Sequence, residues 1–286
     1  MKPLPELAGQ HPELPLVHDG TVPLPEGLRG GVMLLGSFDG MHRGHAALVA
    51  AGRETARRSG GPLSILQCDP HPRGFFAGAS RFRVSTGAAQ MRMLADAGLD
   101  YVYAPRFDAV FAGMPAEEFV LRVLVDHLGI GGVVVGRDFR FGRNRDGDVA
   151  LLAALSASLP FSLTVVEDET DGGCRISTSA VRHAIAAGDI GAGTVLLGHG
   201  WLTEISCTGA DRWRFAADQI LPPPGRWAVA ALDLAGRHLA DCVLELDAAG
   251  TAHMAAPPGT ALITWLPAAG EQISLKPEIR GAHARL

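Results

Sequence analysis

Two histidines near the start of the chain are spaced so that they could bind phosphate together. The segment 36–45 reads GSFDGMHRGH and contains His42 and His45. Residues three apart share one face of a helix, so the two imidazoles lie side by side if a helix begins at this point. The first turn of a helix also has free backbone N–H groups and the positive end of the helix dipole. The segment therefore predicts an anion site in which two imidazoles donate hydrogen bonds to phosphate oxygens.

The glycines of this segment suit a ligand that approaches the backbone closely. Gly36 and Gly40 lack a Cβ, and Gly44 leaves room for a base or a ribose above the helix. A zinc site is the alternative interpretation of a histidine pair, but it needs a third ligand. His71 is the only candidate that the nearby sequence offers. We therefore expect no metal ligand from the protein itself.

Short apolar runs that alternate with helical patterns must position this segment. Five such runs predict buried strands, at 31–36, 63–68, 100–105, 132–136 and 161–167. Helical patterns lie between and after them, at 42–58, 88–97, 115–129, 147–159 and 179–187. The alternation predicts an α/β fold with a five-stranded parallel sheet, doubly wound with helices on both faces.

Polar segments follow four of the five predicted strands directly. In a sheet of this type the ligand lies outside the carboxyl ends of the strands, where the strand order reverses. The segments are SFDGMHRGH (37–45), DPHPR (69–73), RDFRFGR (137–143) and, after an acidic loop, RISTSAVR (175–182). The fold therefore predicts that all four converge on one edge of the sheet and form the site.

These segments resemble a known family of enzymes. GSFDGMHRGHAALV (36–49) is similar to the ATP signature of the HxGH nucleotidyltransferases, and especially to the adenylyltransferase half of bacterial bifunctional riboflavin kinase/FAD synthetases. The resemblance extends, in order, from residue 30 to residue 198. It implies a Rossmann-like domain that transfers AMP from ATP to FMN, giving FAD and pyrophosphate. Other similar stretches are DPHPRGFF (69–76), GRDFRFGRNRDGD (136–148) and ISTSAVRHAIAAGDI (176–190).

The resemblance implies roles for the residues around the nucleotide. His42 and His45 would contact the phosphates of ATP, and Arg182 would hold the departing phosphates. Magnesium would come with ATP, bound largely by the substrate phosphates. For the three hydroxyl residues of the last helix, simple capping of the helix is the alternative. The remaining residues implied in ATP binding are Gly36, Ser37, Phe38, Asp39, Gly40, Gly44, Ser177, Thr178 and Ser179.

The resemblance places the flavin beside two other segments. Pro70, His71 and Pro72 would form a rigid ledge against one face of the isoalloxazine. Asp138 would accept a hydrogen bond from a ring N–H, and Phe141 would pack on the ring system. Core packing is the alternative for Phe139 and Phe141. One arginine would meet the FMN phosphate, either Arg140 or Arg143.

The pattern changes after residue 198, so we divide the chain into a Pro-rich extension (1–29), the nucleotidyltransferase domain (30–198) and a small domain (199–286). Short apolar runs separated by Gly, Pro and Asp predict a β-barrel-like structure in the small domain. It resembles a degenerate riboflavin kinase domain. The kinase half of the family carries a Gly-Phe-Pro-Thr-Ala-Asn element that the corresponding stretch 199–224 lacks, and Asn144 is the only asparagine of the chain. We therefore expect no riboflavin kinase activity.

Composition excludes several classes of partner. The net charge is −5 and no basic stripe is present, so we expect no binding to nucleic acid. No apolar run approaches the roughly 18 residues of a membrane span, and the N-terminus does not read as a secretory signal. The four cysteines are widely spaced, which suits a reducing compartment. We expect a cytoplasmic protein whose partners are small nucleotides and flavin; the sequence predicts no oligomeric state.

Two alternatives to FMN adenylylation stay open at this point. The acceptor of AMP could be a modified flavin or another phosphorylated metabolite. The chain could also be a flavin- or nucleotide-binding module with little turnover, although His42, His45 and Arg182 are more than a pure binder needs.

Overall fold

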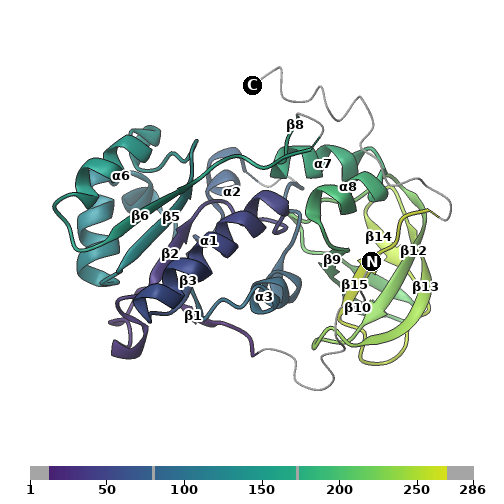
Figure 1. Cartoon of the computed structure of the whole chain (residues 1–286). Coiled ribbons are helices and arrows are strands. Elements are labelled where there is room, and N and C mark those ends of the chain that lie inside the picture. Colours follow the sequence, from purple (N-terminus) through teal and green to yellow (C-terminus); the bar gives the residue numbers. More distant parts are fainter. Residues whose placement is uncertain (1–12, 79–80, 172–173, 269–286) are drawn as a thin grey trace, which may run out of the picture.

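The computed structural model describes residues 13–78, 81–171 and 174–268, so parts of the predicted extension and of the small domain lie outside the described residues. The chain has an α/β part built on a parallel sheet and a β part built on an antiparallel sheet, and the two lie side by side (Figure 1). Among the described residues no helix is long and apolar enough to cross a membrane.

The parallel sheet confirms the predicted fold class and adds one strand to it. The five expected strands are β2 (Val32–Leu35), β3 (Leu63–Leu66), β4 (Tyr101–Tyr103), β5 (Gly132–Gly136) and β6 (Ser162–Val166). A sixth, β1 (Leu16–His18), comes from the N-terminal extension and pairs in parallel with β4. The predicted number of five was therefore wrong by one. The sixth strand was missed because backbone hydrogen bonds, rather than a buried apolar face, hold β1 at the sheet edge. Leu16 and Val17 both remain about half exposed.

The strand order is β1-β4-β3-β2-β5-β6. The chain moves outward from β2 through β3 to β4, and then returns to the other side of β2 with β5. The order therefore reverses between β2 and β5, which pair in register as far as Leu35 and Val135. A ligand site is expected just beyond these two residues.

The expected helices are present, with one change of geometry. The predicted 115–129 helix opens with one turn, α5 (Ala116–Glu118), and continues as a wide-turn π-helix, η2 (Phe119–His127). Wide-turn segments of this kind often occur near functional sites. The other expected helices are α1 (Arg43–Ser59), α3 (Gly87–Asp96), α6 (Val149–Ser156) and α7 (Thr178–Ala186).

Several short elements were not predicted. The longest is α8 (Ile190–Leu197), which is apolar on all sides and contains two glycines, so it shows no helical period. Its ends are nevertheless well defined, because Asp189 caps the Ala192 N–H and Gly198 closes the helix in the left-handed conformation. The remaining short elements are η1 (Glu26–Leu28), α2 (Pro72–Ala77), α4 (Ala109–Ala112), η3 (Arg143–Arg145), β7 (Thr170–Asp171) and β8 (Cys174–Arg175).

The β part confirms the mostly-β structure expected after residue 198. Its sheet has the order β10-β11-β14-β13-β12-β15-β9, and neighbouring strands are antiparallel. The strands are β9 (Trp201–Glu204), β10 (Ser206–Gly209), β11 (Arg212–Arg214), β12 (Gly225–Leu232), β13 (His238–Leu246), β14 (Thr251–His253) and β15 (Leu262–Trp265).

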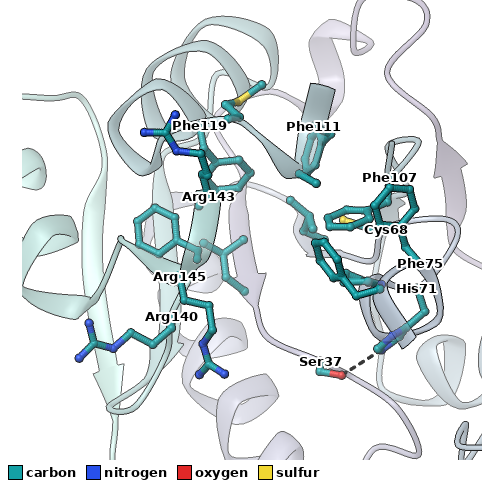
Figure 2. A pocket seen from close by; sticks show the side chains of 18 of the residues that line it. Ser37, Cys68, His71, Phe75, Phe107, Phe111, Phe119, Arg140, Arg143 and Arg145 are labelled. Atoms are coloured by element: carbon teal, nitrogen blue, oxygen red, sulfur yellow. Dashed lines mark hydrogen bonds between the residues drawn. The ribbon is translucent and has the colours of Figure 1, made fainter. Parts of the chain in front are cut away.

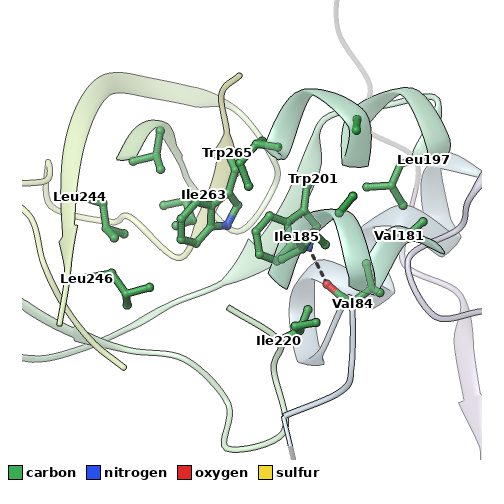
Figure 3. Packing of buried hydrophobic residues seen from close by; sticks show 14 of the residues in the cluster. Val84, Val181, Ile185, Leu197, Trp201, Ile220, Leu244, Leu246, Ile263 and Trp265 are labelled. Carbon is green, nitrogen blue, oxygen red and sulfur yellow. Dashed lines mark hydrogen bonds between the residues drawn. The ribbon is translucent and has the colours of Figure 1, made fainter. Parts of the chain in front are cut away.

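Buried residues of α7 and α8 also belong to the core of the β part (Figure 3). Trp201 and Trp265 stack at its centre, with ring centroids 4.8 Å apart. Val181 and Ile185 of α7 and Leu197 of α8 belong to the same buried cluster. The hydrophobic packing therefore crosses the predicted boundary at residue 198, and the division of the chain into domains there stays a prediction.

Candidate active site

The two histidines lie together at the start of α1. His42 is the residue before the first helical residue, and its imidazole makes no capping hydrogen bond. His45 lies in the first turn, and the two rings stack with centroids 3.7 Å apart and planes 18° from parallel. Their spacing predicts this shared face. Serine, threonine, aspartate and asparagine are the usual residues at the position of His42, so an imidazole there indicates a purpose other than capping.

Both imidazoles are neutral near pH 7. Burial lowers the pKa of His42 to about 4, and the positive charges of Arg175 and Arg182 contribute. Burial, with a smaller effect of His42, lowers the pKa of His45 well below its usual value. Within the described residues the Nδ1 atoms of both rings are buried and have no hydrogen-bond partner. The pair therefore has hydrogen-bonding capacity that the described part of the protein does not use.

Two glycines of the segment 36–45 lie close to other parts of the protein. A Cβ at Gly44 would lie 3.1 Å from Cε1 and 3.2 Å from Nδ1 of His42. The space above this helical turn is thus partly taken by the His42 ring, whereas the sequence suggested room for a base or ribose. Gly40 has a φ of +83°, and a Cβ there would lie 2.5 Å from Val84. Only glycine fits this position without strain.

Asp39 ties the loop to two distant segments. Its carboxylate is 2% exposed and accepts hydrogen bonds from the backbone N–H groups of Val84, at 2.8 Å, and Ser85, at 3.0 Å. The other oxygen accepts from Nη2 of Arg182 at 2.9 Å, and Nε of Arg182 donates to the carbonyl of Phe82. Asp39 therefore orients the guanidinium of Arg182, and the ATP-binding role that the resemblance implies for Asp39 stays a prediction.

The histidines and Arg182 line one cavity of about 460 Å³. It lies between the start of α1, the end of β5 and the start of α7. Ser177 caps α7 by accepting a hydrogen bond from the Ala180 N–H, and it also lines the cavity. This position is compatible with both helix capping and ATP binding, the two interpretations of this residue. The other predicted ATP-binding residues in its wall are Gly36, Ser37, Gly44, Thr178 and Ser179. Phe38, Asp39 and Gly40 lie outside it. We call this the nucleotide cavity.

A second cavity, of about 770 Å³, adjoins the first (Figure 2). Phenylalanine rings make up much of its wall, so we call it the phenylalanine cavity. Its rings are those of Phe38, Phe75, Phe76, Phe107, Phe111, Phe119, Phe139 and Phe141. Phe139 and Phe141 stack, with centroids 5.5 Å apart. Phe141 is also part of the hydrophobic core, so packing and ligand contact are combined in this residue.

The predicted flavin residues divide between the cavities. His71, Pro72, Arg140, Phe141 and Arg143 line the phenylalanine cavity. His71 is held in place because its Nε2 lies 3.3 Å from the Ser37 hydroxyl and its Nδ1 accepts from the Arg73 N–H. Two other predicted residues lie elsewhere. Pro70 is in neither wall, and Asp138 lines the nucleotide cavity, where it pairs with Arg175.

The two cavities share one wall, and it contains a residue that we did not predict. The shared residues are Leu35, Gly36, Ser37, Phe139 and Arg145. Arg145 and the preceding Asn144 both have left-handed backbones, with φ of 61° and 55°. Such a conformation is uncommon for arginine, and such strain often occurs at functional sites. The asparagine before Arg145 was the signal in the sequence, since asparagine adopts this conformation readily.

The aromatic residues of the second cavity were also largely missed. The sequence does contain a signal for them, since Phe75 and Phe76 are adjacent and Phe107 and Phe111 are four residues apart. These four lie on α2, on α4 and in the loop before α4, all in segments that were predicted poorly because they are short.

The nucleotide cavity offers no unpaired carboxylate for magnesium within the described part of the chain. Asp138 and Asp168 pair with Arg175, Glu167 pairs with Arg137, and Glu169 pairs with Arg43. No group of three or more His, Cys, Asp or Glu side chains in the described segments is placed to hold a metal ion. The described residues therefore do not form a protein-bound magnesium site.

Comparison with known proteins identifies the family of the chain. The family model for FAD synthetase matches residues 24–180, more than half of the chain. The chain belongs to the FAD synthetase family. It is 39% identical over 171 residues to the bifunctional riboflavin kinase/FMN adenylyltransferase of Escherichia coli K12. The aligned region covers 59% of this chain and 55% of that protein. This confirms the resemblance to the family that the sequence motifs indicated.

A further relative and a solved structure of similar fold show the extent of the similarity. A putative bifunctional riboflavin kinase/FMN adenylyltransferase of Geobacillus thermodenitrificans is 35% identical over 172 residues, 60% of this chain and 91% of that protein. A crystal structure of a macrolide-efflux protein from Streptococcus pneumoniae has a TM-score of 0.73 at 18% identity, over 89% of this chain and 90% of that chain. The latter supports the fold of both parts. The aligned region spans only about half of the E. coli relative.

We predict that His42 makes the free protein less stable in acid. The imidazole has a pKa of about 4 in the folded chain and 6.5 without burial, so the unfolded chain binds the proton first. This contribution to stability is complete above pH 6.5 and is lost as the pH falls toward 4. Melting temperatures of the wild type and of His42→Gln, measured from pH 4 to 8, should converge or cross in this range. Parallel curves would contradict the prediction.

Proposed function

We propose that the chain transfers AMP from ATP to FMN, which gives FAD and pyrophosphate. The observation that carries the proposal is the shared wall between two cavities of opposite character. The nucleotide cavity has imidazoles, hydroxyls and a guanidinium suited to a triphosphate, whereas the phenylalanine cavity suits a large flat ring system. Membership of the FAD synthetase family supports the same reaction.

The chemistry needs positioning more than reactive groups. An oxygen of the acceptor phosphate attacks the α-phosphorus of ATP, the bond to the bridging oxygen breaks, and pyrophosphate leaves. The protein holds the two reactants in line and stabilises the charge on the phosphoryl oxygens. His42 and His45 would donate neutral N–H groups to these oxygens. Arg182, fixed by Asp39, would supply the positive charge for the leaving pyrophosphate.

The phenylalanine cavity supports a flavin as the acceptor. An isoalloxazine buries most of its surface as a flat apolar face, and phenylalanine rings pack against such faces by stacking or edge contacts. Phe107 lies edge-on to both Phe75 and Phe76, with centroids 5.3 and 5.8 Å away. Arg140 and Arg143 lie along the wall opposite His71, where they could meet polar groups of the flavin (Figure 2).

The phosphate of FMN would lie at the shared wall beside Arg145. Of the three nearby arginines, Arg140 already pairs with Asp148 at 3.2 Å, and Arg143 lines the phenylalanine cavity alone. Arg145 lines both cavities and has no ion-pair partner among the described residues. It therefore has the best position to hold the acceptor phosphate next to the α-phosphate of ATP. Magnesium would be bound by the substrate phosphates.

We propose further that the chain does not phosphorylate riboflavin. The stretch 199–224, which lacks the kinase element, forms β9 to β11 and the loop that follows them. The reaction would take place in the cytoplasm, in keeping with the free thiols of Cys68, Cys207 and Cys242. A modified flavin or another phosphorylated metabolite in place of FMN would keep the same chemistry.

The products of two incubations test this function. Purified protein with ATP and FMN should form FAD and pyrophosphate in equal amounts, and protein with ATP and riboflavin should form neither FMN nor FAD; mass spectrometry distinguishes these. His42→Ala, prepared in the same way, should turn over about 10²–10³-fold more slowly if the imidazole stabilises transferred charge. Absence of FAD from FMN would overturn the proposal, and FMN formed from riboflavin would overturn its second part.

The role of Arg145 gives a separate prediction. Arg145→Gln should raise the KM for FMN about tenfold or more, because a charge-assisted hydrogen bond to phosphate is lost. The KM for ATP should change less. Arg137→Gln is the matched control, since Arg137 is on the same loop, pairs with Glu167 and lines neither cavity. Steady-state kinetics with an unchanged KM for FMN, or an equal effect of both substitutions, would contradict this assignment.

A further inference from the structure

Residues 82–86 link the candidate active site to the β part, and we call them the linking segment. On one side, the backbone N–H groups of Val84 and Ser85 donate to Asp39, and the carbonyl of Phe82 accepts from Arg182. This side of the segment thus determines where the carboxylate of Asp39 lies and how the guanidinium of Arg182 is oriented.

The other side of the linking segment is bound by the β part. Gln219 is fully buried, and its amide nitrogen donates to the carbonyls of Arg83, at 3.0 Å, and Val84, at 2.9 Å. Its amide oxygen accepts from the hydroxyl of Thr86 at 3.0 Å. The indole N–H of Trp201 donates to the same Val84 carbonyl at 2.8 Å. The side-chain donors of two β-part residues therefore converge on one peptide group.

Backbone hydrogen bonds strengthen this attachment. The N–H groups of Phe82 and Arg83 both donate to the carbonyl of Asp218 at 2.8 Å, and the N–H of Ile220 donates to the carbonyl of Arg83 at 2.8 Å. A segment paired on both sides in this way has little freedom to move independently of either part.

Helix α7 is fixed by the same part of the protein. Val181 and Ile185, which flank Arg182 in sequence, are buried in the cluster that contains Trp201, Ile220 and Val84 (Figure 3). The β part thus holds both the helix that carries the guanidinium and, through the linking segment, the carboxylate that orients it.

We infer that the β part is a positioning domain for AMP transfer, in which Gln219 and Trp201 act as positioning residues through the linking segment on Asp39 and Arg182. The inference rests on the proposed function. Removal of the Trp201 indole N–H or of the Gln219 amide leaves the buried carbonyl of Val84 with one hydrogen-bond partner fewer. The linking segment then relaxes away from its position. Small displacements of positioning groups reduce turnover strongly, even when they begin far from the reacting atoms.

A matched pair of substitutions tests the inference. Trp201→Phe and Trp213→Phe each remove an indole N–H from the same buried cluster. The indole of Trp201 donates to Val84, whereas that of Trp213 donates to Met254 within the β part, at 2.9 Å. We expect Trp201→Phe to lower kcat about tenfold with the KM for FMN nearly unchanged, as for a group that acts in the transition state. Trp213→Phe should lower the melting temperature but leave kcat within twofold.

Gln219→Met provides a second variant, of similar volume but without the donors. It should lower kcat in the same way and speed hydrogen exchange in peptides that contain residues 82–86. Equal losses of kcat in Trp201→Phe and Trp213→Phe, or unchanged kcat in both Trp201→Phe and Gln219→Met, would overturn the inference. If the wild type forms no FAD, the proposed function fails. In that case two other measurements test the inference without turnover. They are hydrogen exchange at residues 82–86 and affinity for a non-hydrolysable ATP analogue, each compared between the variants.

Discussion

The buried carboxylate of Asp39 is the constraint on which the site depends. A carboxylate that is 2% exposed is costly unless its oxygens are paired, and here two backbone N–H groups and one guanidinium pair them. The three donors come from the linking segment and from α7. One side chain therefore holds the loop after β2, the linking segment and Arg182 in a single arrangement.

This arrangement divides the work between neutral and charged groups. The stacked imidazoles of His42 and His45 are kept neutral by burial and offer hydrogen bonds without adding charge. Arg182 has its charge shared with Asp39 but still lines the nucleotide cavity. In the AMP transfer that we propose, the reacting groups already carry several negative charges, so the protein would have to orient them and offset part of the charge. Fixed donors do this without reorganisation at the moment of reaction.

The sequence predicted what depends on neighbouring residues and missed what depends on distant ones. The strands and α1 follow from local apolar patterns, and the stacking of His42 with His45 follows from helical spacing. The partners of Asp39 lie 45, 46 and 143 residues away, so the motif around Asp39 could not predict them. Likewise, β1 has little apolar pattern of its own. Its pairing with the neighbouring strand β4 stabilises it, and this pairing could not be predicted from the local sequence.

The same distinction applies to the cavities. The resemblance named the segments that form the flavin side, yet Asp138 lies in the nucleotide cavity, where it pairs with Arg175. Arg145 reaches the shared wall through an unusual backbone conformation, which residue type alone does not indicate. The packing of α7 against the β part could not be predicted either, since it joins residues on both sides of a change in sequence pattern.

A crystal structure with a non-hydrolysable ATP analogue and FMN would test the central claim most directly. The account predicts the triphosphate against His42 and His45, the isoalloxazine among the phenylalanine rings, and the two reacting phosphates adjacent at Gly36 and Arg145. A flavin bound outside the phenylalanine cavity, or a nucleotide remote from the stacked imidazoles, would contradict it.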